Sequence, residues 1–82
     1  MIFVKFTLLN SEEGAVDYLV GASLRDVLTD AENVFSNRRI ESHQVITEEE
    51  VRALNLEHFE QGIRCVRDEG VKCFYIGYHK PH

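Results

Sequence analysis

The sequence has few cations, no tryptophan and no long apolar run. Fourteen Asp and Glu residues outnumber nine Lys and Arg residues, which gives a formal net charge of −5. A negative chain opposes nonspecific binding to nucleic acid or to anionic membranes, because phosphate contacts need clustered cations. No apolar stretch approaches the ~18–20 residues that a membrane-spanning helix requires. The charge therefore favours a basic or nucleic-acid-binding protein as partner, with no direct contact to nucleic acid or membrane.

Cysteine, proline and glycine are also scarce. The chain has two cysteines, one proline and five glycines. Two cysteines do not make the disulfide framework of a small secreted domain. Residues 1–9 are apolar but contain Lys5 and Thr7 and no small-residue cleavage site, so no signal peptide is predicted. The glycines stand singly, which excludes a glycine-rich phosphate loop. We expect a soluble, cytoplasmic protein with no cofactor.

The length predicts a single domain over residues 1–82. Domains typically run about 100–150 residues and rarely divide below that size. An apolar content of 44% is ordinary for a folded protein and too high for a disordered chain. A chain this short buries only about 60–65% of its extended-state surface, so we expect a thin core.

Four segments are predicted to be strands. Residues 1–9 alternate, and their second face is half apolar, which favours a central strand. A turn at residues 10–14, with Gly14 free to take a positive φ, leads to a return strand at 16–20. Residues 39–46 alternate poorly and suit an edge strand. The last strand, 71–79, should place Phe74, Ile76 and Tyr78 on one face and Cys73, Tyr75 and His79 on the other.

Two helical segments separate these strands. Ser23 is a good N-cap for a helix whose apolar side chains recur every 3.6 residues as far as Phe35, with Asn37 as a plausible stop. Thr47 and Glu50 form a capping box for a second helix, which Gly70 is expected to close. Gly62 inside this helix indicates close packing against the sheet. The apolar stripe of that helix changes phase at Asn55, which predicts a kink or a split there, with Asn55 as a possible new cap.

The predicted order is β-β-α-β-α-β, an α+β fold with a four-stranded, mostly antiparallel sheet. Each helix has one apolar stripe, so both helices are expected on the same face of the sheet. The other face would then be open and would expose an apolar patch of the kind that often marks a contact surface. Its side chains would be Phe3, Leu9, Leu19, Cys73, Tyr75 and His79.

One set of residues offers the ligand types of a zinc site: Cys65, Cys73, His79 and His82. The spacing is unlike that of structural zinc sites, and Cys65 on a helix should lie across the sheet from Cys73. We therefore predict packing roles for the cysteines and no metal, with these four residues as the fallback. Cys73 and His79 should lie ~20 Å apart along a strand, so no cysteine–histidine catalysis is expected, and no catalytic residue is predicted.

Clusters of carboxylates lie at turns and helix ends: Glu12-Glu13, Glu48 to Glu50 and Asp68-Glu69. Glu48 to Glu50 stabilise the start of a helix, whereas Asp68 and Glu69 lie at the end where the helix dipole disfavours acids. Tyr75, an aromatic of the type that anchors interfaces, would lie on the open face. The candidate partner-binding residues are Glu48, Glu49, Glu50, Asp68, Glu69, Tyr75 and Tyr78.

Residues 15–46 carry a strand ending in V-G-A-S-L, a helix of the form S-L-x-D-V-x-x-x-A-x-x-x-F and a strand R-I-E-S. This unit resembles short phage-encoded inhibitors of host machinery, such as the small podophage inhibitor of bacterial RNA polymerase and some anti-CRISPR proteins. The resemblance rests on Ala22, Ser23, Leu24, Asp26, Ala31 and Phe35. It implies a stoichiometric binder that blocks a host complex, and it transfers no catalytic residues.

Three function classes remain open. The first is an acidic interaction module that inhibits a host nucleic-acid-handling or defence complex by occlusion. The second is a structural or assembly protein that self-associates through the open sheet face or the edge strand at residues 39–46. The third is an enzyme or metal-binding protein built on Cys65, Cys73, His79 and His82. Both a monomer and a homodimer are compatible with the sequence.

Overall fold

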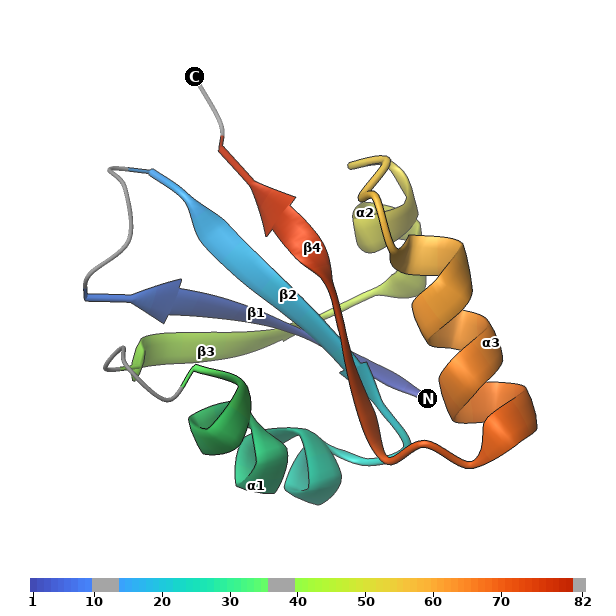
Figure 1. The fold of residues 1–82 in the computed structure, drawn as a ribbon. Helices are drawn as coiled ribbons and strands as arrows, with labels where there is room; N and C mark the ends of the chain where they lie inside the picture. Colours follow the sequence, from blue (N-terminus) through green and yellow to red (C-terminus); the bar gives the residue numbers. More distant parts are fainter. Residues whose placement is uncertain (10–13, 36–39, 81–82) are drawn as a thin grey trace.

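The computed structural model describes residues 1–9, 14–35 and 40–80. The α+β class and the order of the elements confirm the prediction, with the second helical segment split in two (Figure 1). Residues 10–13, which belong to the predicted turn, and Asn37, the predicted helix stop, lie outside the described residues. The elements are β1 (Ile2–Leu8), β2 (Val16–Gly21), α1 (Leu24–Val34), β3 (Ile40–Ile46), α2 (Glu48–Arg52), α3 (Phe59–Glu69) and β4 (Cys73–His79).

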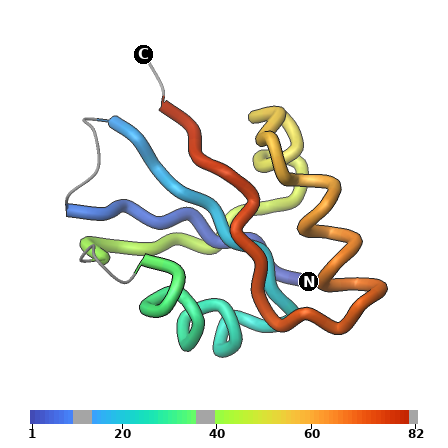
Figure 2. The backbone as a smooth tube through the Cα atoms, viewed as in Figure 1, coloured from blue at the N-terminus to red at the C-terminus, as the bar shows by residue number. Residues whose placement is uncertain are grey.

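The four strands form one antiparallel sheet in the order β3-β1-β2-β4. Strand β1 is central and β3 lies at an edge, as their apolar patterns predict. Because β2 and β3 both run antiparallel to β1, they are parallel to each other, and α1 connects them across β1. Figure 2 traces β3 beside β1, on the side of the sheet away from β4. Among the described residues, no helix is both long and apolar enough to cross a membrane.

The helices cover opposite faces of the sheet, which corrects the prediction that they share one face (Figure 1). Helix α1 packs on a core made of Val4, Phe6, Leu8, Leu19, Val27, Ala31 and Phe35. Helices α2 and α3 pack on a second core made of Phe3, Tyr18, Val20, Val51, Leu56, Phe59, Ile63, Val66 and Ile76. The central strands need cover on both sides because they carry large apolar groups on both sides. The predicted open face, with Tyr75 and Cys73 exposed on it, is therefore wrong.

A bulge in β4 changes which side chains share a face. The pairing with β2 shifts between Tyr18 and Leu19, so that Ile76 is the extra residue and Gly77 adopts a φ of +131°. Beyond the bulge Tyr78 pairs with Asp17 and His79 pairs with Val16. Paired residues lie on the same side of a sheet. Tyr78 therefore shares a face with Tyr75, and His79 lies on the opposite face, which reverses the predicted assignment for both residues.

The helix ends follow the predicted signals with one exception. The backbone N–H of Asp26 donates to Ser23 Oγ at 3.2 Å, so Ser23 caps α1. Gly70 ends α3 in the left-handed conformation, with a φ of +73°. Asn55 takes a positive φ of 53° in the segment between α2 and α3, which confirms the split. It does not cap the new helix, however, because His58 occupies the N-cap position of α3.

Candidate functional site

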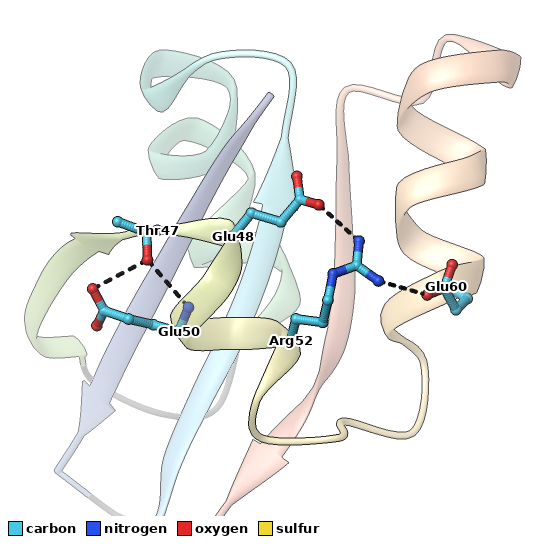
Figure 3. Close-up of polar contacts among 5 residues, drawn as sticks. All are labelled: Thr47, Glu48, Glu50, Arg52 and Glu60. Carbon is cyan, nitrogen blue, oxygen red and sulfur yellow. Dashed lines mark hydrogen bonds and ion pairs between the residues drawn. The ribbon is translucent and has the colours of Figure 1, made fainter.

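Three consecutive glutamates open α2 directly after β3. The backbone N–H of Glu50 donates to Thr47 Oγ1 at 3.1 Å, and the Thr47 hydroxyl donates to Glu50 Oε1 at 3.2 Å (Figure 3). Acidic side chains in the first turn complement the positive end of the helix dipole. Val51 follows and is fully buried in the core, which fixes the side of this short helix that faces the sheet. The glutamates consequently remain on the outer surface.

Arg52 joins α2 to α3. Its Nη2 lies 2.7 Å from Glu48 Oε2 and its Nη1 lies 3.3 Å from Glu60 Oε1 (Figure 3). The guanidinium also lies over the Phe59 ring, 4.8 Å from the ring centroid. The hydrogen bond to Glu48 is the first cause that raises the pKa of Arg52, and the charges of Glu48 and Glu60 raise it further. Arg52 therefore forms ion pairs with one carboxylate of α2 and one carboxylate of α3, an arrangement we call the Arg52 brace.

We use the term α2 acidic surface for the exposed carboxylates of Glu48, Glu49, Glu50, Glu57 and Glu60. Arg52 pairs with Glu48 and Glu60, and His58 Nε2 lies 3.8 Å from Glu57 Oε2. Burial, and after it the charge of Glu50, raises the pKa of the Tyr18 phenol in the core beneath. The field of this surface thus extends into the sheet, and its chemical capacity is to attract cations.

Asp68 and Glu69, the other predicted acidic pair, lie at the far end of α3. Helix α3 has 11 residues. At about 1.5 Å per residue, its two ends are roughly 15 Å apart. Arg67 Nε pairs with Asp68 Oδ1 at 3.1 Å, and the Cys65 thiol lies 4.0 Å from Glu69 Oε2. The hydrogen bond and charge of Asp68 raise the pKa of Arg67, and the charges of Glu60 and Glu48 raise it further, so this cation interacts with both acidic sets.

The two predicted tyrosines lie on the face covered by α1, away from both acidic sets. Tyr75 is partly buried, its hydroxyl donates to Asp17 Oδ1 at 2.7 Å, and its ring centroid lies 6.3 Å from that of Phe35. Tyr75 is thus part of the core. Tyr78 is 64% exposed and remains open to a partner on the same face.

The fallback metal ligands do not converge. Cys65 lies on α3, whereas Cys73 packs against the core under α1, so the cysteines lie on opposite sides of the sheet as predicted. His79 lies at the end of β4, and His82 lies outside the described residues. Within residues 1–9, 14–35 and 40–80, no group of three or more His, Cys, Asp or Glu side chains could hold a metal ion.

Cys73 borders a cleft of about 510 Å³ between α1 and the start of β4. The cleft is lined by Arg25, Asp26, Thr29, Asp30, Val71, Lys72 and Cys73. Burial, followed by the charge and hydrogen bond of Asp30, raises the pKa of the Cys73 thiol to about 12. A thiol that stays protonated at neutral pH is a poor nucleophile, because the thiolate is the reactive form.

Comparison with protein-family models, with curated proteins and with solved structures finds no match to this chain. Of the residues that form the α2 acidic surface, sequence reasoning found Glu48 to Glu50 but missed Glu57, Glu60 and the bracing role of Arg52. The i,i+4 spacing of Glu48 and Arg52 is a signal that could have found that pair. The contact of Arg52 with Glu60 depends on the orientation of α3 relative to α2. Local sequence patterns do not determine that orientation.

Proposed function

We propose that the protein is an acidic protein–protein interaction module, without catalysis, that binds a basic partner through the α2 acidic surface. The observation that carries this proposal is the Arg52 brace, which holds Glu48 and Glu60 at 2.7 and 3.3 Å while Glu49, Glu50 and Glu57 remain exposed. Five carboxylates near Arg52 and Arg67 leave a net negative surface, and Arg52 links its parts on α2 and α3.

A braced acidic surface suits recognition by charge. Complementary charges speed encounter with a basic partner and fix the orientation of the complex. Binding groups that are already held in place lose less conformational entropy on association. Thr47, Val51 and Arg52 hold α2 by a cap, a buried side chain and an ion pair. These contacts supply such preorganisation even though α2 has only five residues.

We further propose that this chain is a phage or mobile-element protein that acts in the cytoplasm of a host cell. Its partner would be a nucleic-acid-handling or defence complex of that cell, which it blocks. The net charge of −5 supports it, because carboxylates can occupy basic sites that otherwise hold phosphates. The resemblance of residues 15–46 to phage-encoded inhibitors also supports it. In this proposal the protein acts by occlusion and is needed in stoichiometric amounts.

The test compares two double charge reversals. Glu49→Lys with Glu57→Lys changes the α2 acidic surface and leaves Glu48, Arg52 and Glu60 intact. Asp68→Lys with Glu69→Lys makes the same change in net charge at the far end of α3 and serves as the matched control. Each tagged protein is used to capture partners from a bacterial lysate, with quantification by mass spectrometry. Circular dichroism checks that both variants are folded.

We expect the first variant to capture about tenfold less partner than the wild type, or less still. Each 1.4 kcal/mol of lost interaction free energy lowers the affinity by a factor of ten. The control variant should retain the partner. Equal loss in both variants would show that only total charge matters. Loss in the Asp68 and Glu69 variant alone would place the contact at the other end of α3 and overturn the proposal for α2.

A further inference from the structure

Strand β3 is an edge that the rest of the described chain leaves uncovered. Its residues Glu41 to Val45 are all exposed, including Val45, which is 47% exposed. Most residues of the two cores belong to β1, β2, β4 and the helices. The middle of β3, Glu41 to Val45, is therefore not covered by a helix on either face. One long side of the strand pairs with β1, and the other long side is the margin of the sheet (Figure 2).

The opposite edge of the sheet is protected by the chain itself. The backbone N–H of His58 donates to the carbonyl of Ile76 at 3.2 Å, so the segment before α3 bonds to β4 at its bulge. Leu56 lies against Gly77 in the same place. Within the part of the chain that the structure describes, no comparable backbone hydrogen bond from a loop reaches β3. The two edges therefore differ, and only β3 is available along its length.

From Ser42 to Ile46, β3 lacks the usual guards of an exposed edge. Lysine, proline and bulges commonly prevent such strands from pairing with another chain. Strand β3 contains neither lysine nor proline, and its one irregularity lies at Glu41, near its start. From Ser42 to Ile46 the register with β1 is regular and the stretch contains no Asp, Glu, Lys or Arg. These five residues form a regular template for one more strand.

We propose that β3 pairs with β3 of a second copy of this chain, antiparallel and centred on Gln44. Antiparallel pairing keeps the two α2 acidic surfaces at opposite ends of the joint, whereas parallel pairing would place them side by side. Centred on Gln44, this pairing places Glu41 of one copy opposite Thr47 of the other and Ile40 opposite Glu48, so the carboxylates nearest to the joint do not face each other.

Centring the pair on Gln44 uses all five regular residues and leaves the irregularity at Glu41 outside. Gln44 then faces its own copy across the two-fold axis, Ser42 faces Ile46, and His43 faces Val45. Directly opposite residues in antiparallel strands have Cα atoms about 4.5–5.5 Å apart. No two like charges are opposed in this register, and the exposed Val45 gains a neighbour. The result is a continuous eight-stranded sheet in a symmetric dimer.

The register predicts a charge-swap experiment at Gln44. In Gln44→Lys two ammonium groups face each other across the axis, and in Gln44→Glu two carboxylates do, and like charges directly opposite disfavour pairing. Lys5 of β1 is the partner of Gln44 within each copy, so it adds to the repulsion in Gln44→Lys and reduces it in Gln44→Glu. Mixing the two variants places Lys against Glu. Gln61→Lys, on the exposed surface of α3, repeats the first charge change away from β3 and is the matched control. Sedimentation equilibrium gives the dimer dissociation constant of each sample, and circular dichroism confirms the fold.

We expect a concentration-dependent dimer for the wild type and for Gln61→Lys. Gln44→Lys alone should dissociate at least tenfold more readily, and Gln44→Glu should weaken the dimer less because Lys5 lies beside it. The mixture should recover the wild-type dissociation constant within about threefold. A wild type that stays monomeric up to millimolar concentration would overturn the proposal and leave the edge for an extended segment of a different protein. A dimer that persists unchanged in both separate variants would also overturn it, because that dimer would use another surface.

Discussion

Gly62 is the residue at which α3 comes closest to the sheet. A Cβ atom at this position would collide with Ile76 Cγ2 and lie 3.1 Å from both Phe74 Cδ1 and Val20 Cγ1. Those neighbours belong to β4 and β2, so the missing side chain lets one helix pack against two strands at once. The presence of a glycine inside a predicted helix indicates such an approach, and here the structure confirms it.

Gly62→Ala is therefore expected to destabilise the protein although alanine favours helices. The collision should cost about 1–3 kcal/mol and the gain in helix propensity is at most about 1 kcal/mol, so the free energy of unfolding should fall by up to about 2 kcal/mol. Gln61→Ala, at the exposed neighbouring position, is the control and should change stability by less than about 0.5 kcal/mol. Urea unfolding measures both. A more stable Gly62→Ala protein would mean that α3 does not press on β4 as described.

The two cysteines should differ in reactivity because their surroundings differ. Burial and the carboxylate of Asp30 raise the pKa of Cys73 to about 12, and this thiol packs under α1. Alkylation requires the thiolate. At pH 8 and in the native state, iodoacetamide should modify Cys65 at least tenfold faster than Cys73, with both equally reactive in denaturant. Mass spectrometry of the digested protein reads out each site, and a faster Cys73 would contradict its placement.

At the scale of single elements, most of the helix and strand pattern could be predicted because its signals are local. Ser23, Thr47 and Gly70 mark helix ends through hydrogen bonds or a φ that neighbouring residues determine. The phase change at Asn55 correctly indicated two helices. The N-cap of α3 was missed because His58 makes no side-chain capping bond, and its position follows from the contact of its backbone with Ile76.

The cap of α1 provides a test at the same scale. Ser23→Ala removes the acceptor for the Asp26 N–H and should lower the free energy of unfolding by about 1 kcal/mol. Ser23→Asp keeps an acceptor and adds a charge that complements the helix dipole, so its stability should equal or exceed that of the wild type. Thermal unfolding followed by circular dichroism measures both variants. An unchanged Ser23→Ala protein would show that the cap contributes nothing.

At the scale of the whole molecule, one sheet supports two cores. The sequence contained the signal for this arrangement, since Phe3 lies between Ile2 and Val4 in β1 and all three are apolar. The prediction failed because one apolar stripe per helix does not say which side of the sheet a helix takes. The bulge at Ile76 was also invisible in the alternation of β4, and it moved Tyr78 and His79 to the opposite faces. Long-range pairing decides both features.

Shared strands should make the two cores unfold together. Phe59 is 5% exposed and its ring stacks on Phe3 with centroids 5.9 Å apart, so Phe59→Ala damages the core under α2 and α3. We expect a loss of about 3–5 kcal/mol. Because β1 and β2 serve both cores, far-ultraviolet circular dichroism and amide exchange in α1 should report the same transition. Separate transitions for the two sides would indicate independent folding units.

The measurement that tests the functional account most directly is capture of a partner from bacterial lysate at rising salt, with and without added nucleic acid. We expect one predominant basic complex that is retained at low salt, lost progressively as salt screens the α2 acidic surface, and displaced by nucleic acid. A captured partner that resists both salt and nucleic acid would contradict the proposal, because binding would then depend on neither the acidic surface nor a nucleic-acid site.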